Sequence, residues 1–148
     1  MLFPPVMLQY HQASLILSFF NLYQPFLTYV KEVILNSRTI ARLIVDTAAE
    51  KKAANILLLE VRPLTTLADY FVICEGTSAR QLNAIRDGIR ETLSEKGYGL
   101  HHQEGTAESG WILLDYEDIL VHIFSPERRA YYQLEELWQS APTVMKML

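Results

Sequence analysis

A turn of small residues and a set of acidic side chains are the first features of this sequence that suggest chemistry. Gly76-Thr77-Ser78 follows an apolar run and precedes a stretch with helical spacing, so a phosphate could rest on the free N–H groups of the turn. Nucleotidyltransferases combine such a turn with carboxylates that hold metal ions, because the developing phosphoryl charge must be neutralised. The candidate carboxylates are Asp69, Glu75, Asp115, Glu117 and Asp118. Such turns are common, however, no Lys follows this one as in a P-loop, and the last three carboxylates are explained more simply as a solvated hairpin turn.

The histidines and the cysteine form no strong metal or nucleophile pattern. His101, His102, Glu104 and His122 could surround an ion, but adjacent histidines in a strand point to opposite faces and cannot easily share it. We therefore expect structural or partner-facing histidines, with no metal, no cofactor and no catalytic residues. Cys74 is the only cysteine and lies within an apolar run, which excludes an intrachain disulfide and favours a buried core thiol in the reducing cytosol.

Aromatic and basic residues in the last third of the chain indicate a protein-binding face. Side chains of Tyr, Trp, Arg and His anchor interfaces because they bury a large area at low entropic cost. We assign Phe124 and Trp138 to the core. If the hairpin loop is Glu117-Asp118, Trp111 and His122 share one face of the sheet, whereas a three-residue loop places them on opposite faces. The aromatic, histidine and arginine residues that gather in this last third of the chain are Trp111, Tyr116, His122, Phe124, Arg128, Arg129, Tyr131, Tyr132 and Trp138.

The composition is that of a folded, acidic domain. The chain has 148 residues, half of them hydrophobic, which suffices for a core and excludes a mainly disordered protein. Asp and Glu number 17 against 13 Lys and Arg, and the formal net charge is −4. A protein that neutralises phosphates usually carries a basic surplus, so we expect neither direct DNA binding nor non-specific RNA binding as the main activity. An acidic protein is suited instead to a basic protein partner.

The first 36 residues differ from the rest of the chain. They contain two charged side chains, Lys31 and Glu32, and seven of the sixteen aromatic residues. We therefore divide the chain into an apolar N-terminal extension, residues 1–37, and a domain, residues 38–148.

The extension is open to several interpretations. Asn21, Gln24 and Pro25 interrupt the apolar stretch that a membrane span needs, and the basic residues of a secretory signal or transit peptide are missing. A peripheral segment, a span, a targeting segment and a leader added by start-site choice all remain. We expect no membrane partner and a cytoplasmic location, or an organellar stroma or matrix if the extension is a targeting segment.

Hydrophobic periodicity and turn residues predict the elements that must position these side chains. Ser78 is a plausible N-cap of the best helix, and Gly97 ends it. The order predicts an α/β (α+β) fold, a mixed sheet of about five strands with helices mainly on one face. The predicted helices are 37–53, 80–96 and 131–138, and the predicted strands are 56–61, 69–74, 100–103, 111–116 and 119–124.

Two series of residues stand in the order and spacing of one family. The first comprises Lys51-Lys52-Ala53, Asp69-Tyr70-Phe71-Val72-Ile73-Cys74, Gly76-Thr77-Ser78, Gln81, Ala84-Ile85, Asp87 and Ile89. The second comprises Glu104-Gly105, Trp111-Ile112-Leu113-Leu114-Asp115-Tyr116, Asp118, Val121-His122-Ile123-Phe124, Arg129, Tyr132, Leu134-Glu135 and Leu137-Trp138. In this joint order, over about residues 39–148, the chain resembles the Iojap family of ribosomal silencing factors, also called RsfS. Asn55, Glu60, Glu75 and Arg86 depart from the usual family residues.

The resemblance implies a fold and a function. The fold of the family is similar to that of nucleotidyltransferases but lacks their catalytic carboxylates, so we expect binding and not catalysis. Members bind the large ribosomal subunit through ribosomal protein L-fourteen, block association with the small subunit and repress translation under nutrient limitation, and they can form homodimers.

The resemblance also implies which residues contact the partner. Apolar anchoring is expected from Trp111 and Tyr116, and polar contacts from His122, Arg129 and Tyr132. Acidic residues for pairing with a basic partner are Asp115, Glu104 and Asp118. The alternative function is a nucleotidyltransferase-like enzyme that acts on a nucleotide with Mg²⁺.

Overall fold

The computed structural model of the chain describes residues 16–28 and 36–148. The chain divides into two units, Met1–Asn36 and Ser37–Leu148. In the first unit, residues 16–28 form a helix, and the rest of the predicted extension lies outside the described residues except for its last two positions. No helix among the described residues combines the length and apolar character that crossing a membrane requires.

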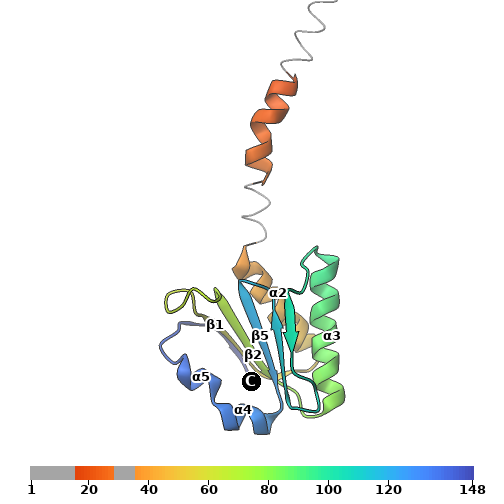
Figure 1. The fold of residues 1–148 in the computed structure, drawn as a ribbon, viewed down its shortest axis with the longest axis vertical. Helices are drawn as coiled ribbons and strands as arrows, with labels where there is room; N and C mark the ends of the chain where they lie inside the picture. Colours follow the sequence, from red (N-terminus) through yellow and green to blue (C-terminus); the bar gives the residue numbers. More distant parts are fainter. Residues whose placement is uncertain (1–15, 29–35) are drawn as a thin grey trace, which may run out of the picture. The chain divides into compact units, whose positions relative to one another are not determined.

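The second unit is built on a mixed six-stranded sheet (Figure 1). Its strands are β1 (Ala54–Glu60), β2 (Tyr70–Glu75), β3 (His102–Glu104), β4 (Trp111–Asp115), β5 (Ile119–Phe124) and β6 (Thr143–Met147). The strand order is β3-β4-β5-β2-β1-β6, and only the pair β2 and β5 is parallel. The mixed sheet confirms the predicted fold class. The estimate of about five strands omitted β6, an edge strand whose half-buried residues give little periodic signal.

Two long helices, α2 (Ser37–Glu50) and α3 (Ala79–Glu95), pack on one face of the sheet through their apolar sides. The Ser78 hydroxyl accepts a hydrogen bond from the Gln81 N–H and so satisfies one of the free donors at the start of α3. Gly97 follows the last turn at a positive φ of 84°, which favours glycine. Both helix boundaries therefore follow the sequence prediction closely.

The C-terminal helical region differs from the single predicted helix 131–138. The chain forms α4 (Pro126–Tyr132) and α5 (Leu134–Leu137), with Gln133 between them in the left-handed region. Ser125 caps α4 and Pro126 occupies its first turn, where a missing N–H costs nothing. The helix therefore starts five residues earlier than predicted, because the capping residues and not the aromatic ones set its beginning.

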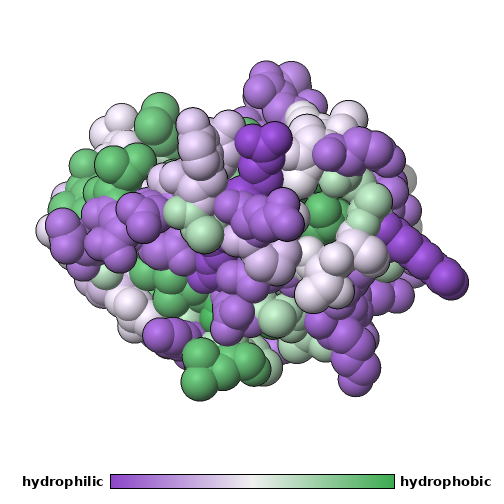
Figure 2. Space-filling view, turned by 90° about the horizontal axis from the view of Figure 1, so that it is seen from below, coloured by the Kyte–Doolittle hydropathy of each residue, from purple (hydrophilic) through white to green (hydrophobic). Residues whose placement is uncertain are grey.

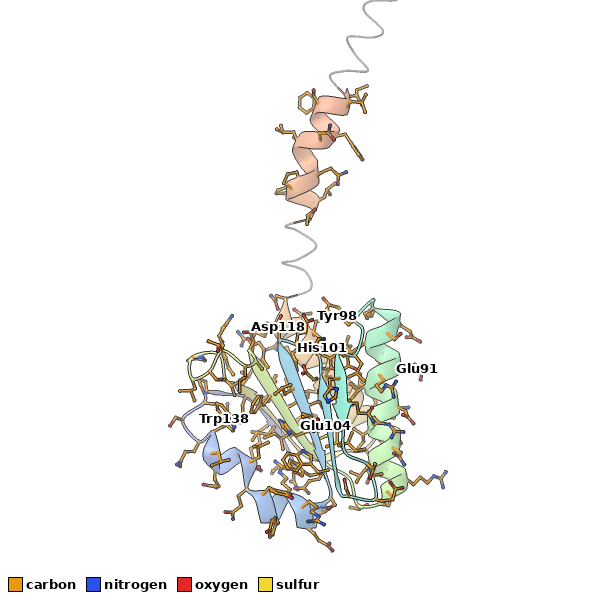
Figure 3. The ribbon with its side chains drawn as sticks, viewed as in Figure 1. Glu91, Tyr98, His101, Glu104, Asp118 and Trp138 are labelled. Atoms are coloured by element: carbon orange, nitrogen blue, oxygen red, sulfur yellow. The ribbon has the colours of Figure 1, made fainter. Side chains whose placement is uncertain are left out.

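The opposite face of the sheet carries a second apolar cluster. The Trp138 ring lies edge-on against Phe71, with ring centroids 5.0 Å apart, so α5 covers part of this face (Figure 3). Phe124 is fully buried and Trp138 is half-buried, which confirms both core assignments. The buried members of the cluster are Leu59, Val61, Ala68, Phe71, Ile73, Phe124 and Ala141.

Candidate partner-binding site

The hairpin between β4 and β5 decides which residues share a face. The Tyr116 N–H donates to the carbonyl oxygen of Ile119, so the loop contains two residues, Glu117 and Asp118. In this register Trp111 lies opposite Phe124, and Leu113 lies opposite His122. Trp111 and His122 are therefore on the same face, as the two-residue alternative predicted.

Three of the predicted contact residues lie together on this face. The Nε1–H of Trp111 donates a hydrogen bond of 3.3 Å to Nδ1 of His122. Tyr132, at the end of α4, places its ring centroid 4.6 Å from that of Trp111. Tyr132 is 43% exposed and Trp111 is half-buried. We call Trp111, His122 and Tyr132 the aromatic cluster.

His122 supports the aromatic cluster from beneath. Its side chain is buried, and its ring lies edge-on against Phe71 with centroids 5.2 Å apart. Because burial removes the charged form from water, the pKa of His122 is lowered to about 4, and the imidazole is neutral near pH 7. Nδ1 accepts from Trp111, so the remaining ring proton is assigned to Nε2, a buried atom with no hydrogen-bond partner among the described residues.

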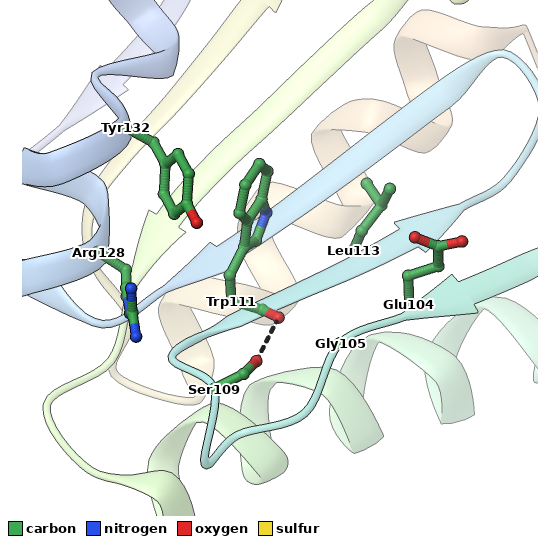
Figure 4. Close-up of a pocket in the computed structure, with 7 residues that line it drawn as sticks. All are labelled: Glu104, Gly105, Ser109, Trp111, Leu113, Arg128 and Tyr132. Carbon is green, nitrogen blue, oxygen red and sulfur yellow. Dashed lines mark hydrogen bonds between the residues drawn. The ribbon is translucent and has the colours of Figure 1, made fainter.

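The aromatic cluster borders a pocket of about 360 Å³ (Figure 4). The rings of Trp111 and Tyr132 stand side by side in it, and Glu104 and Leu113 lie toward the other end. Gly105 has a positive φ of 78°, and a Cβ there would collide with the backbone oxygen of Trp111, so only glycine lets the loop approach β4 this closely. The lining residues are Glu104, Gly105, Ser109, Trp111, Leu113, Arg128 and Tyr132.

Arg129 is engaged within the molecule. Its side chain is 11% exposed and forms ion pairs with Glu75 (3.2 Å) and Glu135 (2.7 Å). It also donates a 2.6 Å hydrogen bond to the backbone oxygen of Asn55. The Asn55 amide in turn donates to Glu75. Arg129 therefore ties α4 to the sheet and to α5. Only the guanidinium atoms outside these internal bonds remain to contact a partner.

The other two predicted contact residues lie away from the aromatic cluster. Asp115 ends β4 on the same face as Trp111, and its carboxylate accepts a hydrogen bond from the backbone N–H of Glu117. Tyr116 follows it on the opposite face, where burial raises the pKa of its hydroxyl to about 12 and where Arg90 of α3 is a nearby charge. The structure thus separates Tyr116 from Trp111 by the thickness of the sheet.

The groups of the enzymatic alternative are dispersed. The Gly76-Thr77-Ser78 turn follows the end of β2, whereas Asp69 precedes its start and hydrogen-bonds through its N–H to the backbone of Asp118. Of the five candidate carboxylates, only Glu75 lies next to the turn, and it is paired with Arg129. Among the residues that the structure describes, no three His, Cys, Asp or Glu side chains are grouped as metal ligands. Cys74 is fully buried as expected, and burial raises the pKa of its thiol to about 12.

Polar side chains surround the aromatic cluster. Glu104 and Arg128 are both exposed at the pocket, and the Glu104 carboxylate lies 3.0 Å from the His102 ring. Viewed from the end of the domain that carries α4, the surface is mostly hydrophilic, with hydrophobic residues in separate groups (Figure 2). A half-exposed aromatic centre with a polar rim is the usual anatomy of a protein interface.

Sequence reasoning missed Leu113 as a site residue. The signal was present, because residues i and i+2 of a strand share a face and Leu113 follows Trp111 by two. The same alternation places Tyr116, five residues after Trp111, on the other side.

The chain is similar to known proteins over most of its length. A family model described as "Ribosomal silencing factor during starvation" matches residues 35–147. The ribosomal silencing factor RsfS of Bacillus subtilis is 37% identical over 108 residues, which cover 73% of this chain and 92% of that protein. The chloroplastic protein Iojap of Zea mays is 37% identical over 97 residues, covering 66% of this chain and 42% of that protein. A crystal structure of a protein from Chromobacterium violaceum superposes with a TM-score of 0.69 at 30% identity, covering 71% of this chain and 88% of that one.

Proposed function

This chain belongs to the ribosomal silencing factor family, and from that premise we propose that it binds the large ribosomal subunit through ribosomal protein L-fourteen. A protein seated there occupies the surface that the small subunit needs, so it blocks subunit association by steric exclusion and represses translation. This action needs a docking surface and no chemical step, so we propose a binding protein and not an enzyme.

The aromatic cluster is the observation that supports this proposal best. Tyr132 exposes 43% of its surface, and its ring lies against Trp111, which is itself held by a hydrogen bond to buried His122. Aromatic side chains that are already positioned lose little entropy on binding, and Trp and Tyr are enriched among the residues that dominate interface energies. We therefore place the centre of the docking surface at Trp111 and Tyr132.

Charge is proposed to orient the complex. Glu104 at the pocket and Asp115 at the far end of β4 give this face acidic side chains, and the whole chain carries a net charge of −4. An acidic rim around an apolar centre speeds the encounter with a basic protein and fixes its register. Arg129 contributes by holding the site together through its internal ion pairs. Tyr116 lies on the opposite face of the sheet and is therefore outside the proposed docking surface.

The decisive experiment compares Tyr132 with an exposed apolar residue outside the aromatic cluster. We expect Tyr132→Ala to weaken co-sedimentation with isolated large subunits by about tenfold or more, the usual effect of truncating a central aromatic contact. Leu67→Ala is the control, since Leu67 is 72% exposed, lies between β1 and β2 and is not part of the pocket lining. Leu67→Ala is expected to bind as the wild type does. Tyr131 is unsuited as a control, because its ring lies edge-on against Tyr132 with centroids 5.0 Å apart.

Function is measured by subunit reassociation. The wild type and Leu67→Ala are expected to slow the joining of separated subunits, and Tyr132→Ala is expected to have lost this effect while its circular dichroism is unchanged. If the wild type in large excess fails to slow joining, the proposed mechanism is wrong. If Tyr132→Ala and Leu67→Ala bind equally well, the docking surface lies elsewhere.

Location and self-association belong to the same proposal. A ribosome-binding protein acts where ribosomes are, which is the cytoplasm, or an organelle as the name of chloroplastic Iojap in Zea mays indicates for that relative. Formation of homodimers is a further expectation from the family, and sedimentation equilibrium of the purified chain measures it.

A further inference from the structure

The helix formed by residues 16–28 has two chemically different sides. Successive residues of a helix turn by about 100°, which places seven large apolar side chains on one side and the polar ones, with Pro25, on the other. Leu17 is the single exception. All seven apolar side chains are more than half exposed. The apolar side comprises Ile16, Phe19, Phe20, Leu22, Tyr23, Phe26 and Leu27, and the polar side comprises Ser18, Asn21, Gln24, Pro25 and Thr28.

The helix carries no charge. No Asp, Glu, Lys or Arg occurs among residues 16–28, and the polar side uses only hydroxyl and amide groups besides the proline. In coiled coils, charged residues beside the apolar seam select the partner helix, and charged partner surfaces require complementary charges. A neutral polar side above an aromatic apolar side matches instead a surface with apolar depth and zwitterionic headgroups.

The two-sided pattern of the helix decides its orientation in such a surface. A helix that crosses a bilayer is apolar on every side, because acyl chains surround it. Here Ser18, Asn21 and Gln24 belong to a continuous polar side. An amphipathic helix of this kind lies in the plane of the interface with its apolar side among the acyl chains.

We propose that residues 16–28 bind the surface of a lipid bilayer, which replaces the sequence-based expectation that the chain has no membrane partner. The rings of Phe19, Phe20 and Phe26 insert below the headgroups, and Asn21 and Gln24 face water. Because the helix is uncharged, binding does not depend on anionic lipid or on salt. It is stronger on highly curved vesicles, whose packing defects accept bulky rings. The family match begins at residue 35, so this property is separate from the ribosome-binding domain.

The test is flotation of the full-length chain with vesicles of pure phosphatidylcholine. We expect the wild type to float with small sonicated vesicles at both low and high salt, and to float less with large extruded ones. The variant Phe19→Ser with Phe26→Ser is expected to lose about tenfold or more in affinity, because two inserted rings are removed. The matched control, Asn21→Ser with Gln24→Ser, introduces the same residue twice on the polar side and is expected to float as the wild type does.

Other outcomes overturn the proposal. It is wrong if the wild type does not float with neutral vesicles, if salt abolishes flotation, or if the Phe19 and Phe26 double variant floats unchanged. A wild type that does not float can still be a dimer without lipid. If sedimentation equilibrium shows such a dimer and this double variant dissociates it, the apolar side contacts a second copy of the chain and not a bilayer. Large-subunit binding of both double variants should equal that of the wild type, which separates this test from that of the proposed function.

Discussion

At the scale of single residues, the proposed docking face depends on side chains that serve structure and binding together. Trp111 donates its indole N–H to buried His122 and offers part of its ring to solvent. His122 must stay neutral for this arrangement, because an imidazolium at that position would be buried without a counter-ion. Tyr132 is exposed enough to be removed without opening the core, which makes it the better probe of binding.

The first prediction concerns His122 and pH. Its folded-state pKa of about 4 lies below an ordinary value of 6.5, so the unfolded chain binds the proton more readily between these values. The contribution of neutral His122 is present above about pH 6.5 and is lost as the pH falls toward 4, with a total on the order of 3 kcal/mol. The free energy of unfolding in urea should therefore fall less between pH 7 and pH 4 in His122→Gln than in the wild type. His102→Gln, at an exposed position, is the control and should follow the wild type.

The second prediction concerns Gly105. An alanine there would meet the backbone oxygen of Trp111 and would need a positive φ, so Gly105→Ala should lower the free energy of unfolding by about 1–3 kcal/mol. It should also weaken large-subunit binding, because the loop borders the pocket. Gly99→Ala has open space and no positive φ, and it should be neutral or slightly stabilising. Equal denaturation midpoints for the two variants would contradict the close approach.

At the scale of elements, α4 is held by ion pairs as well as by apolar packing. It is a short helix with no buried residues, so its position depends on Arg129, which joins Glu75 of β2 and Glu135 of α5. Because Tyr132 belongs to the same helix, the orientation of the proposed docking surface depends on this network.

The third prediction tests that connection. Arg129→Met should lower the free energy of unfolding by roughly 2–4 kcal/mol, because two carboxylates that are largely buried lose their shared cation. Arg128→Met, at the exposed neighbouring position, should change it by less than about 0.5 kcal/mol. Chemical denaturation of both variants measures the difference. Equal stabilities would show that apolar contacts alone fix α4.

At the scale of the whole molecule, the described core and the proposed docking surface both lie in residues 37–148. Every buried core side chain among the described residues lies between Ile40 and Ala141. All six strands and the four helices that cover the sheet belong to this unit. The chain thus combines this domain with an apolar segment for which we propose a separate role.

The fourth prediction follows from this division. A variant that lacks residues 1–36 should keep the free energy of unfolding within about 1 kcal/mol and should bind large subunits as the full chain does, since every described core residue is kept. A variant that lacks residues 143–148 should be strongly destabilised, although fewer residues are lost, because β6 pairs with β1. Urea denaturation and co-sedimentation measure both. Loss of binding in the first variant would make the N-terminal unit part of the docking surface.

The sequence by itself determined the parts of this protein that depend on short-range patterns. Ser78 and Gly97 bracket α3, the run from Tyr70 to Cys74 forms a buried strand, and the joint order of motifs identifies the family. Such features are encoded within a few neighbouring residues, where caps and hydrophobic period act locally. Strand alternation also predicted the faces of Leu113 and Tyr116 relative to Trp111, whereas the face of His122 depended on the length of the loop between β4 and β5.

Only the tertiary structure decided what depends on residues far apart in the chain. It placed Arg129 between Glu75 and Glu135 and not at the free surface, and it added β6 to the edge of the sheet. The environment of a guanidinium, or the partner of an edge strand, is set by groups that approach each other only when the chain folds. A docking surface is therefore defined by folding, because its exposed, buried and paired side chains are sorted by contacts between distant segments.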